Sequence, residues 1–136
     1  MDCVFCKIAN NEIPSFKIYE DDLILAFLDA SPAAEGHTLI IPKRHFENIF
    51  DIENNYLNKI ISTAKIIAEK MKSDLGVEGV NIYHASGKAA EQSVFHFHLH
   101  IIPRVPDDTI DFTGATNKNI KKLNPEEMEE IRKKLT

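Results

Sequence analysis

A stretch in which histidines alternate with apolar residues, residues 94–104, constrains the fold of this chain more than any other. It reads V-F-H-F-H-L-H-I-I-P-R and has histidines at every second position, His96, His98 and His100. Successive side chains of a β-strand point to opposite faces, so the three imidazoles would share one face and the apolar residues the other. The alternation therefore predicts a strand that buries one face, presents three histidines on the other and ends at Pro103.

Three histidines on one face are more informative than one. A single histidine on a strand is usually an ordinary hydrogen-bonded residue of the core or surface. A cluster of histidines destabilises a half-buried site, because charged imidazoles repel each other and neutral imidazoles each need a hydrogen-bond partner. Since clustered titratable groups concentrate at functional sites, we interpret the triplet as part of one.

The length and charge of the chain limit its class. Its 136 residues suit one domain, with a core over about residues 3–104 and a C-terminal extension over about residues 105–136. The net charge of −5 argues against a nucleic-acid partner. No apolar run approaches the roughly 20 residues of a membrane span, and the amino terminus does not resemble a signal peptide. We expect a cytoplasmic protein with no membrane partner.

Apolar periodicity and turn residues predict an α+β fold with a mostly antiparallel sheet. The expected strands cover residues 16–20, 23–29, 38–41, 80–84 and the histidine stretch. The expected helices are a short turn over residues 3–10, a long helix over about 52–75 and a last helix that Asn124 and Pro125 begin. The apolar stripe of the long helix consists of Leu57, Ile60, Ile61, Ala64, Ile67, Ala68, Met71 and Leu75. Residues 106–122 have no strong pattern and are expected to form a loop.

Three sequence blocks together resemble the histidine-triad (HIT) superfamily of nucleotide hydrolases and transferases. H-F-H-L-H-I-I at residues 96–102 matches the family motif in full. C-V-F-C-K-I at residues 3–8 and G-H-T-L-I-I-P-K-R-H at residues 36–45 resemble two further family blocks. The resemblance implies a HIT-like fold, in which a five-stranded sheet packs with the long helix and the C-terminal helix, and it implies a homodimer.

The resemblance also implies a reaction. The middle histidine of the family attacks the α-phosphate of a nucleotide conjugate, and water resolves the nucleotidyl-histidine; the matching residue is His98. An ordinary imidazole is largely neutral near pH 7, so it can attack without a stronger base. By the same resemblance His100 stabilises developing charge and His37 helps to order the site. The implied enzyme hydrolyses or transfers nucleotides from nucleoside phosphoramidates or dinucleoside polyphosphates.

The substrate-binding residues also follow from the resemblance. It places a purine base against four apolar residues, Phe5, Ile8, Phe27 and Leu39. Each of these could equally be ordinary core. Asp29 would accept hydrogen bonds from the ribose hydroxyls, since one carboxylate can serve both hydroxyls of a cis diol. Gln92 and Ser93 would contact the leaving group or the phosphate.

Two residues separate Cys3 from Cys6, a spacing typical of metal-binding or redox pairs in a reducing compartment. Tetrahedral zinc needs four nitrogen or sulfur ligands. In the zinc-containing, prokaryotic-type branch of the family these are the two cysteines, the histidine matching His45 and the first triad histidine, matching His96. Because all four are present, we favour structural zinc over a redox pair or a buried pair.

Two positions depart from the family pattern and leave the leaving group open. Glu91 stands where the family often has glycine, and Ala85 where many relatives have asparagine. These departures motivate a second hypothesis, a non-catalytic nucleotide-binding or regulatory module stabilised by zinc. A third is a zinc-stabilised interaction domain that binds no nucleotide.

Overall fold

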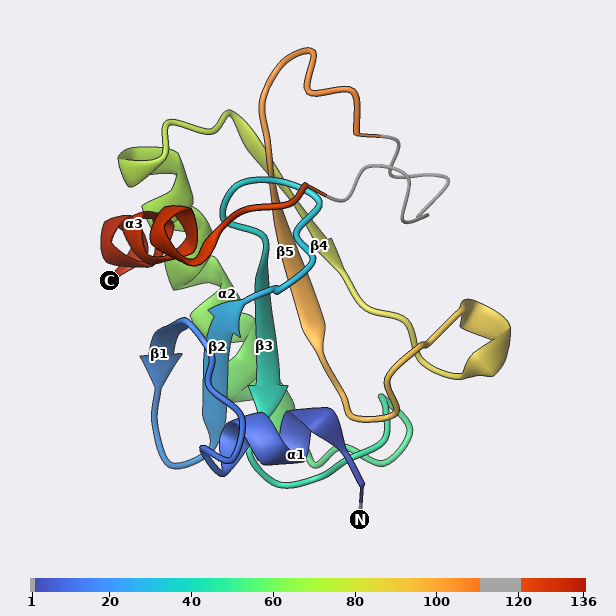
Figure 1. Cartoon of the computed structure of the whole chain (residues 1–136). Coiled ribbons are helices and arrows are strands. Elements are labelled where there is room, and N and C mark those ends of the chain that lie inside the picture. The colour runs from blue at the N-terminus through green and yellow to red at the C-terminus, as the bar shows by residue number, and fades with distance from the viewer. Residues whose placement is uncertain (1, 111–120) are drawn as a thin grey trace.

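The computed structural model describes residues 2–110 and 121–136 and shows a five-stranded sheet with helices packed on it (Figure 1). The strand order is β1-β2-β3-β5-β4, and every neighbouring pair is antiparallel. The elements are α1 (Val4–Ala9), β1 (Lys17–Glu20), β2 (Ile24–Leu28), β3 (Thr38–Pro42), α2 (Asn54–Asp74), β4 (Gly79–Tyr83), the 3-10 turn η1 (Lys88–Ala90), β5 (Leu99–Arg104) and α3 (Pro125–Leu135). The predicted α+β class and five-stranded sheet are confirmed.

Both faces of the central strands are covered, which is why β2 and β3 are buried along their whole length. On one face, alternate strand residues pack against α2 and α3; this main core includes Ile24, Ala26, Ile40, Ile60, Ala64, Met71, Ile101 and Met128. On the other face, Leu25, Phe27, Leu39 and Ile41 pack against the short helix α1. The prediction that Ile61 belongs to the buried stripe of α2 is wrong, because its side chain is half exposed.

The histidine stretch differs from its prediction at both ends. The strand begins at Leu99, so His96 and His98 precede it, and Phe95 is 42% exposed instead of buried. The Phe97 amide donates to the Phe46 carbonyl of the loop after β3, at 2.7 Å, instead of to a neighbouring strand. Pro103 lies within β5 and does not end it. Pairing of β5 with β3 stops at Ile101, so the missing N–H of Pro103 removes no hydrogen bond from that pair of strands.

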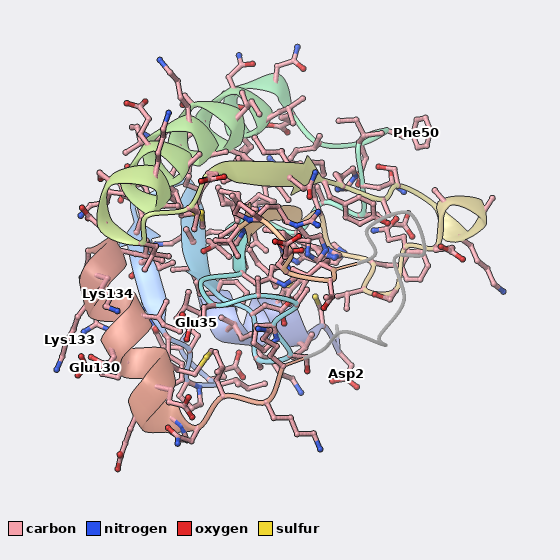
Figure 2. The ribbon with its side chains drawn as sticks, turned by 90° about the horizontal axis from the view of Figure 1, so that it is seen from above. Asp2, Glu35, Phe50, Glu130, Lys133 and Lys134 are labelled. Atoms are coloured by element: carbon pink, nitrogen blue, oxygen red, sulfur yellow. The ribbon has the colours of Figure 1, made fainter. Side chains whose placement is uncertain are left out.

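Helix α3 begins where the sequence predicts. The Asn124 side chain accepts from the Glu127 amide at 2.8 Å, and the Glu127 carboxylate accepts from the Asn124 amide at 3.2 Å, which forms a capping box. Charged residues Glu130, Lys133 and Lys134 lie along the outer side of α3 (Figure 2), while Met128, Ile131 and Leu135 are buried. Most of the loop predicted over residues 106–122 lies outside the described residues.

Phe50 is the most exposed large apolar residue of the described chain; its ring projects into solvent between β3 and α2 (Figure 2). Across residues 2–110 and 121–136, none of the helices has both the length and the apolar character needed to cross a bilayer.

Candidate active site and metal centre

A cavity of about 590 Å³ lies beside the two later triad histidines. Its polar lining includes Asp29, Ser93, His98 and His100. The apolar lining includes all four residues predicted to contact a base, Phe5, Ile8, Phe27 and Leu39. These four residues also belong to the small core between α1 and the sheet. The two interpretations of them are therefore compatible, since the same side chains pack the core and form the cavity wall.

His98 is held in one tautomer by the backbone. Its Nδ1 lies 2.8 Å from the carbonyl oxygen of His96. A carbonyl can only accept, so Nδ1 carries the proton and Nε2 keeps its lone pair. The ring is buried and packs edge-on against Phe5, with 5.0 Å between the ring centroids. His98 thus has the unprotonated nitrogen that a nucleophile requires.

A chain of two hydrogen bonds, which joins Ala33, His37 and His100, places the His100 proton on the opposite nitrogen from that of His98. The Ala33 amide donates to Nδ1 of His37 at 3.0 Å, so the proton of that neutral ring is on Nε2. Nε2 of His37 lies 2.9 Å from Nδ1 of His100, which must accept. The His100 proton is therefore on its own Nε2. The cavity is therefore lined by two imidazoles of opposite character. His98 has a lone pair at Nε2 and His100 has an N–H at Nε2, and their ring centroids are 5.0 Å apart.

Burial keeps these histidines neutral. It is the largest cause of a pKa of about 3 for His100, and the neighbouring His37 and His98 lower this pKa further. Burial also lowers the pKa of His98 below its usual range. The pKa of His37 falls for the same reason, although the nearby Asp29 carboxylate opposes the shift. All three rings are consequently uncharged near pH 7, as the hydrogen-bond chain requires.

Asp29, His37 and His100 bring three donor atoms within 4.8 Å of one another, which could suggest a metal site. The hydrogen bonds argue against it. A metal at Nε2 of His37 would force the ring proton onto Nδ1, where it would face the Ala33 N–H. The Asp29 carboxylate accepts from the Ser31 amide at 2.9 Å, and its other oxygen lies 3.5 Å from His37. We assign this group to hydrogen bonding.

Cys3, Cys6, His45 and His96 form a second cluster, with all four donor atoms within 4.8 Å of one another. The cysteines come together because Cys3 caps α1 and Cys6 lies in its first turn. Nδ1 of His96 lies 3.4 Å from Sγ of Cys3 and 3.1 Å from Nδ1 of His45. The sequence separates these residues by up to 93 positions, so the fold alone assembles the cluster.

The donors of this cluster fit a tetrahedral ion. Nε2 of His96 lies 2.8 Å from the Pro42 carbonyl and must donate to it, which leaves Nδ1 free to bind metal. With metal–ligand distances of about 2.0–2.3 Å, a tetrahedron has edges of about 3.3–3.8 Å, close to the contacts of 3.1–3.5 Å here. Burial raises the pKa of the Cys6 thiol to about 11, unlike the lowered values of reactive redox thiols, and a bound metal would have to displace this proton. The cluster is a candidate metal centre.

The HIT domain model matches residues 10–107. The chain belongs to the HIT family. It is 44% identical over 121 residues to an uncharacterized HIT-like protein of Borreliella burgdorferi, covering 88% of this chain and 87% of that protein. It is 46% identical over 102 residues to an adenosine 5'-monophosphoramidase of Saccharomyces cerevisiae, covering 75% of this chain and 62% of that enzyme. A zinc-bound histidine triad family protein from Mycobacterium smegmatis superposes with a TM-score of 0.85 at 35% identity, covering 99% and 94% of the two chains.

Gln92 and Ser93 of the HIT chain have different surroundings. The Gln92 amide group is buried and bonds only to backbone: it accepts from the Gly87 amide at 2.7 Å and donates to the carbonyls of Glu47 and Val94. It therefore holds the loop before the triad, and its predicted contact with substrate stays untested. Ser93 lines the cavity, as the prediction requires.

His84 supports the backbone of the candidate site. Its Nδ1 donates to the His98 carbonyl at 3.0 Å, its ring stacks on Phe97, and its Nε2 accepts from the Ser86 hydroxyl. His84 thereby fixes the backbone of His98. No motif could have revealed this, because the contact is made to a main-chain atom.

Glu91, one of the two departures from the HIT pattern, ends the turn η1 with a φ of 66°, in the left-handed region. Glycine adopts this region without the strain that a side chain brings. The glycine common at this position in the family thus has a backbone explanation.

Proposed function

We propose that this HIT protein is a nucleotide hydrolase or nucleotidyl transferase that cleaves at the α-phosphate of nucleoside phosphoramidates or dinucleoside polyphosphates. The proposal depends chiefly on one observation: the His96 carbonyl holds the proton of His98 on Nδ1 and leaves Nε2 with a free lone pair. The yeast relative, named an adenosine 5'-monophosphoramidase, supports the substrate class.

In the proposed reaction, Nε2 of His98 attacks the α-phosphorus and the bond to the leaving group breaks. The leaving group departs with the bonding electrons and takes one proton from the solvent, which regains a proton when water resolves the intermediate. The Nε2–H of His100 donates to a phosphoryl oxygen as negative charge develops on it. Water then attacks the phosphorus, and the phosphorus–nitrogen bond to His98 breaks to give a mononucleotide and the free imidazole.

The remaining cavity residues would bind the nucleotide. Asp29 retains acceptor capacity for two ribose hydroxyls, since its hydrogen bond with the Ser31 amide uses only part of one oxygen. Ser93 is placed to contact the phosphate or the leaving group. The apolar wall would bind a purine base.

The test is mononucleotide release from adenosine and guanosine phosphoramidates and dinucleoside polyphosphates. We expect turnover by the unchanged protein and a loss of roughly 10⁴-fold or more in His98→Ala. Intact-mass analysis after rapid acid quenching should show a nucleotidyl adduct that His98→Ala lacks. Full activity in this variant would refute the role of His98. Binding of nucleotide without turnover would instead support a non-catalytic nucleotide-binding or regulatory module.

We also propose structural zinc at Cys3, Cys6, His45 and His96. When bound, it would tie α1 to the loop after β3 and to the segment before β5, with no open position for chemistry. Metal analysis should find about one zinc per chain, and Cys6→Ser should lose it. Serine is isosteric but a poor zinc ligand, so the variant isolates the thiolate. A folded wild-type protein without metal would contradict the proposal.

A homodimer remains a proposal that one feature of the sheet supports. β4 is an edge strand, and Ile82 on it is 46% exposed. Unpaired edges with exposed apolar residues favour pairing with another chain. Light scattering should give twice the chain mass of 15.4 kDa, and a single-chain mass would exclude the dimer. The cytoplasmic location and the absence of nucleic-acid partners stay predictions from composition.

A further inference from the structure

We propose that His84 is a positioning residue of the reaction: its side chain holds the main chain of His98 in place for attack on the phosphorus. Hydrogen bonds that run from the Ile49 amide through Ser86 to His84, called the relay below, orient that side chain. The inference rests on the proposed function, because it takes His98 to be the nucleophile. Ile49, His84 and Ser86 are not among the residues that line the cavity, so their effect on the reaction passes through His98.

The sheet does not supply the hydrogen bond that His84 makes. Tyr83 of β4 pairs with His100 of β5. The same register would place Ala85 opposite His98, but β4 ends at Tyr83 and β5 begins only after His98. The His98 carbonyl instead accepts from Nδ1 of His84 at 3.0 Å. A side chain thus takes the place of a strand at the residue that carries the proposed nucleophile.

The direction of every hydrogen bond in the relay is determined. A carbonyl only accepts, so the bond to His98 requires the proton of His84 on Nδ1. Nε2 of the neutral ring then accepts from the Ser86 hydroxyl. A backbone amide only donates, so the Ile49 N–H, at 3.0 Å from Oγ of Ser86, leaves that hydroxyl its proton for His84. The Nδ1–H tautomer of His84 satisfies all three bonds.

Packing fixes the plane of the His84 ring. The ring stacks on Phe97, with 4.2 Å between the ring centroids and 22° between the planes. Phe97 is almost fully buried in the main core, and its amide donates to the Phe46 carbonyl at 2.7 Å. Phe46 and Ile49 both belong to the loop between β3 and α2. This loop therefore holds the segment before β5 at two points, directly at Phe97 and through the relay at His98.

The position of His98 affects the rate more than it affects binding. Its Nδ1 is bonded to the His96 carbonyl at 2.8 Å, so the ring and the main chain around it form one hydrogen-bonded unit. A shift of about 1 Å in a reacting group can lower a rate by roughly 10²-fold. The nucleotide contacts the cavity wall, which His84 does not line. Loss of the His84 donor should therefore lower kcat and leave KM within a few-fold.

Two substitutions separate the hydrogen bond of His84 from its packing. His84→Phe keeps a ring to stack on Phe97 but has no N–H, whereas His84→Asn loses the ring and keeps a side-chain N–H near the position of Nδ1. We expect kcat for mononucleotide release to fall by roughly 10–100-fold in His84→Phe and by less than about 5-fold in His84→Asn. Ser86→Ala, which breaks the relay but leaves the donor, should lower kcat by about 2–5-fold.

A merely structural role predicts a different order. Because His84→Asn gives up the ring stack, its melting temperature should fall more than that of His84→Phe, while kcat should follow the opposite order. Ile131→Ala is the control for stability alone, since Ile131 is buried in α3 and does not line the cavity. It should lower the melting temperature and leave kcat unchanged at a temperature where it is folded. Nitrogen NMR of the wild type should place the His84 proton on Nδ1.

The outcomes separate the two proposals. Wild-type rates in both His84→Phe and Ser86→Ala would overturn this inference and leave the proposed function standing. A kcat that follows the melting temperature across the variants, or a His84 proton on Nε2, would overturn it as well. Ser86→Ala removes only a hydroxyl group and decides the test if neither variant of His84 folds. Wild-type protein that releases no mononucleotide from phosphoramidates or dinucleoside polyphosphates refutes the proposed function and the inference together.

Discussion

Replacing His37 with alanine tests the hydrogen-bond chain on which the proposed chemistry depends. The substitution removes the acceptor of the Ala33 amide, at 3.0 Å, and the donor to Nδ1 of His100, at 2.9 Å. His37 is only 5% exposed, so water does not readily replace either bond. Each buried group left unpaired costs about 1–3 kcal/mol, so for the two groups we expect the free energy of unfolding to fall by about 2–6 kcal/mol.

The same substitution should change the His100 tautomer. Without the N–H of His37 at its Nδ1, His100 can carry its proton there and lose the donor at Nε2. Loss of a single donor to developing negative charge typically lowers kcat by about 10²–10³-fold. His37→Gln is the matched control, because its side-chain amide offers both an acceptor and a donor, and it should retain more activity than His37→Ala.

Three measurements check this prediction. Urea unfolding gives the stability, nitrogen NMR of the imidazoles gives the tautomer of His100, and mononucleotide release gives the rate. The reasoning fails if His100 in His37→Ala keeps its proton on Nε2, or if the rate stays within a few-fold of wild type. The NMR result bears on the hydrogen-bond chain even if the protein has no turnover.

Two further predictions concern stability. Glu91→Gly should raise the free energy of urea unfolding by about 1 kcal/mol, because glycine relieves the left-handed backbone at a φ of 66°. Glu91→Ala removes the same charge but keeps the strain, so an equal gain in both variants would argue against the backbone explanation. Acid should destabilise the protein between about pH 6.5 and pH 3, since the pKa of His100 is about 3 when folded and the unfolded chain binds its proton first. This histidine contributes a slope of up to about 1.4 kcal/mol per pH unit, and His100→Asn should show a shallower loss; an unchanged slope would exclude His100 as its source.

Local patterns in the sequence were sufficient for much of the fold. The β1–β2 hairpin, the long helix and the start of α3 at Asn124 each follow from short-range periodicity or capping, which act over a few residues. The family resemblance named eight of the side chains that line the cavity and all four of the Cys/His cluster. The same periodicity failed for residues 94–98, because the alternation specifies which faces are apolar but not where a neighbouring strand is available to pair.

The chemical state of the site was decided only by the tertiary structure. The amino-acid sequence determined that six histidines were present and that three alternated along the chain. Which nitrogen of each carries the proton depends on the Pro42 carbonyl, the His96 carbonyl and the Ala33 amide. Ser15 and Met128 likewise line one cavity although more than 100 residues of chain separate them. Hydrogen-bond direction and burial arise from contacts between distant segments, and a one-dimensional pattern contains no information about them.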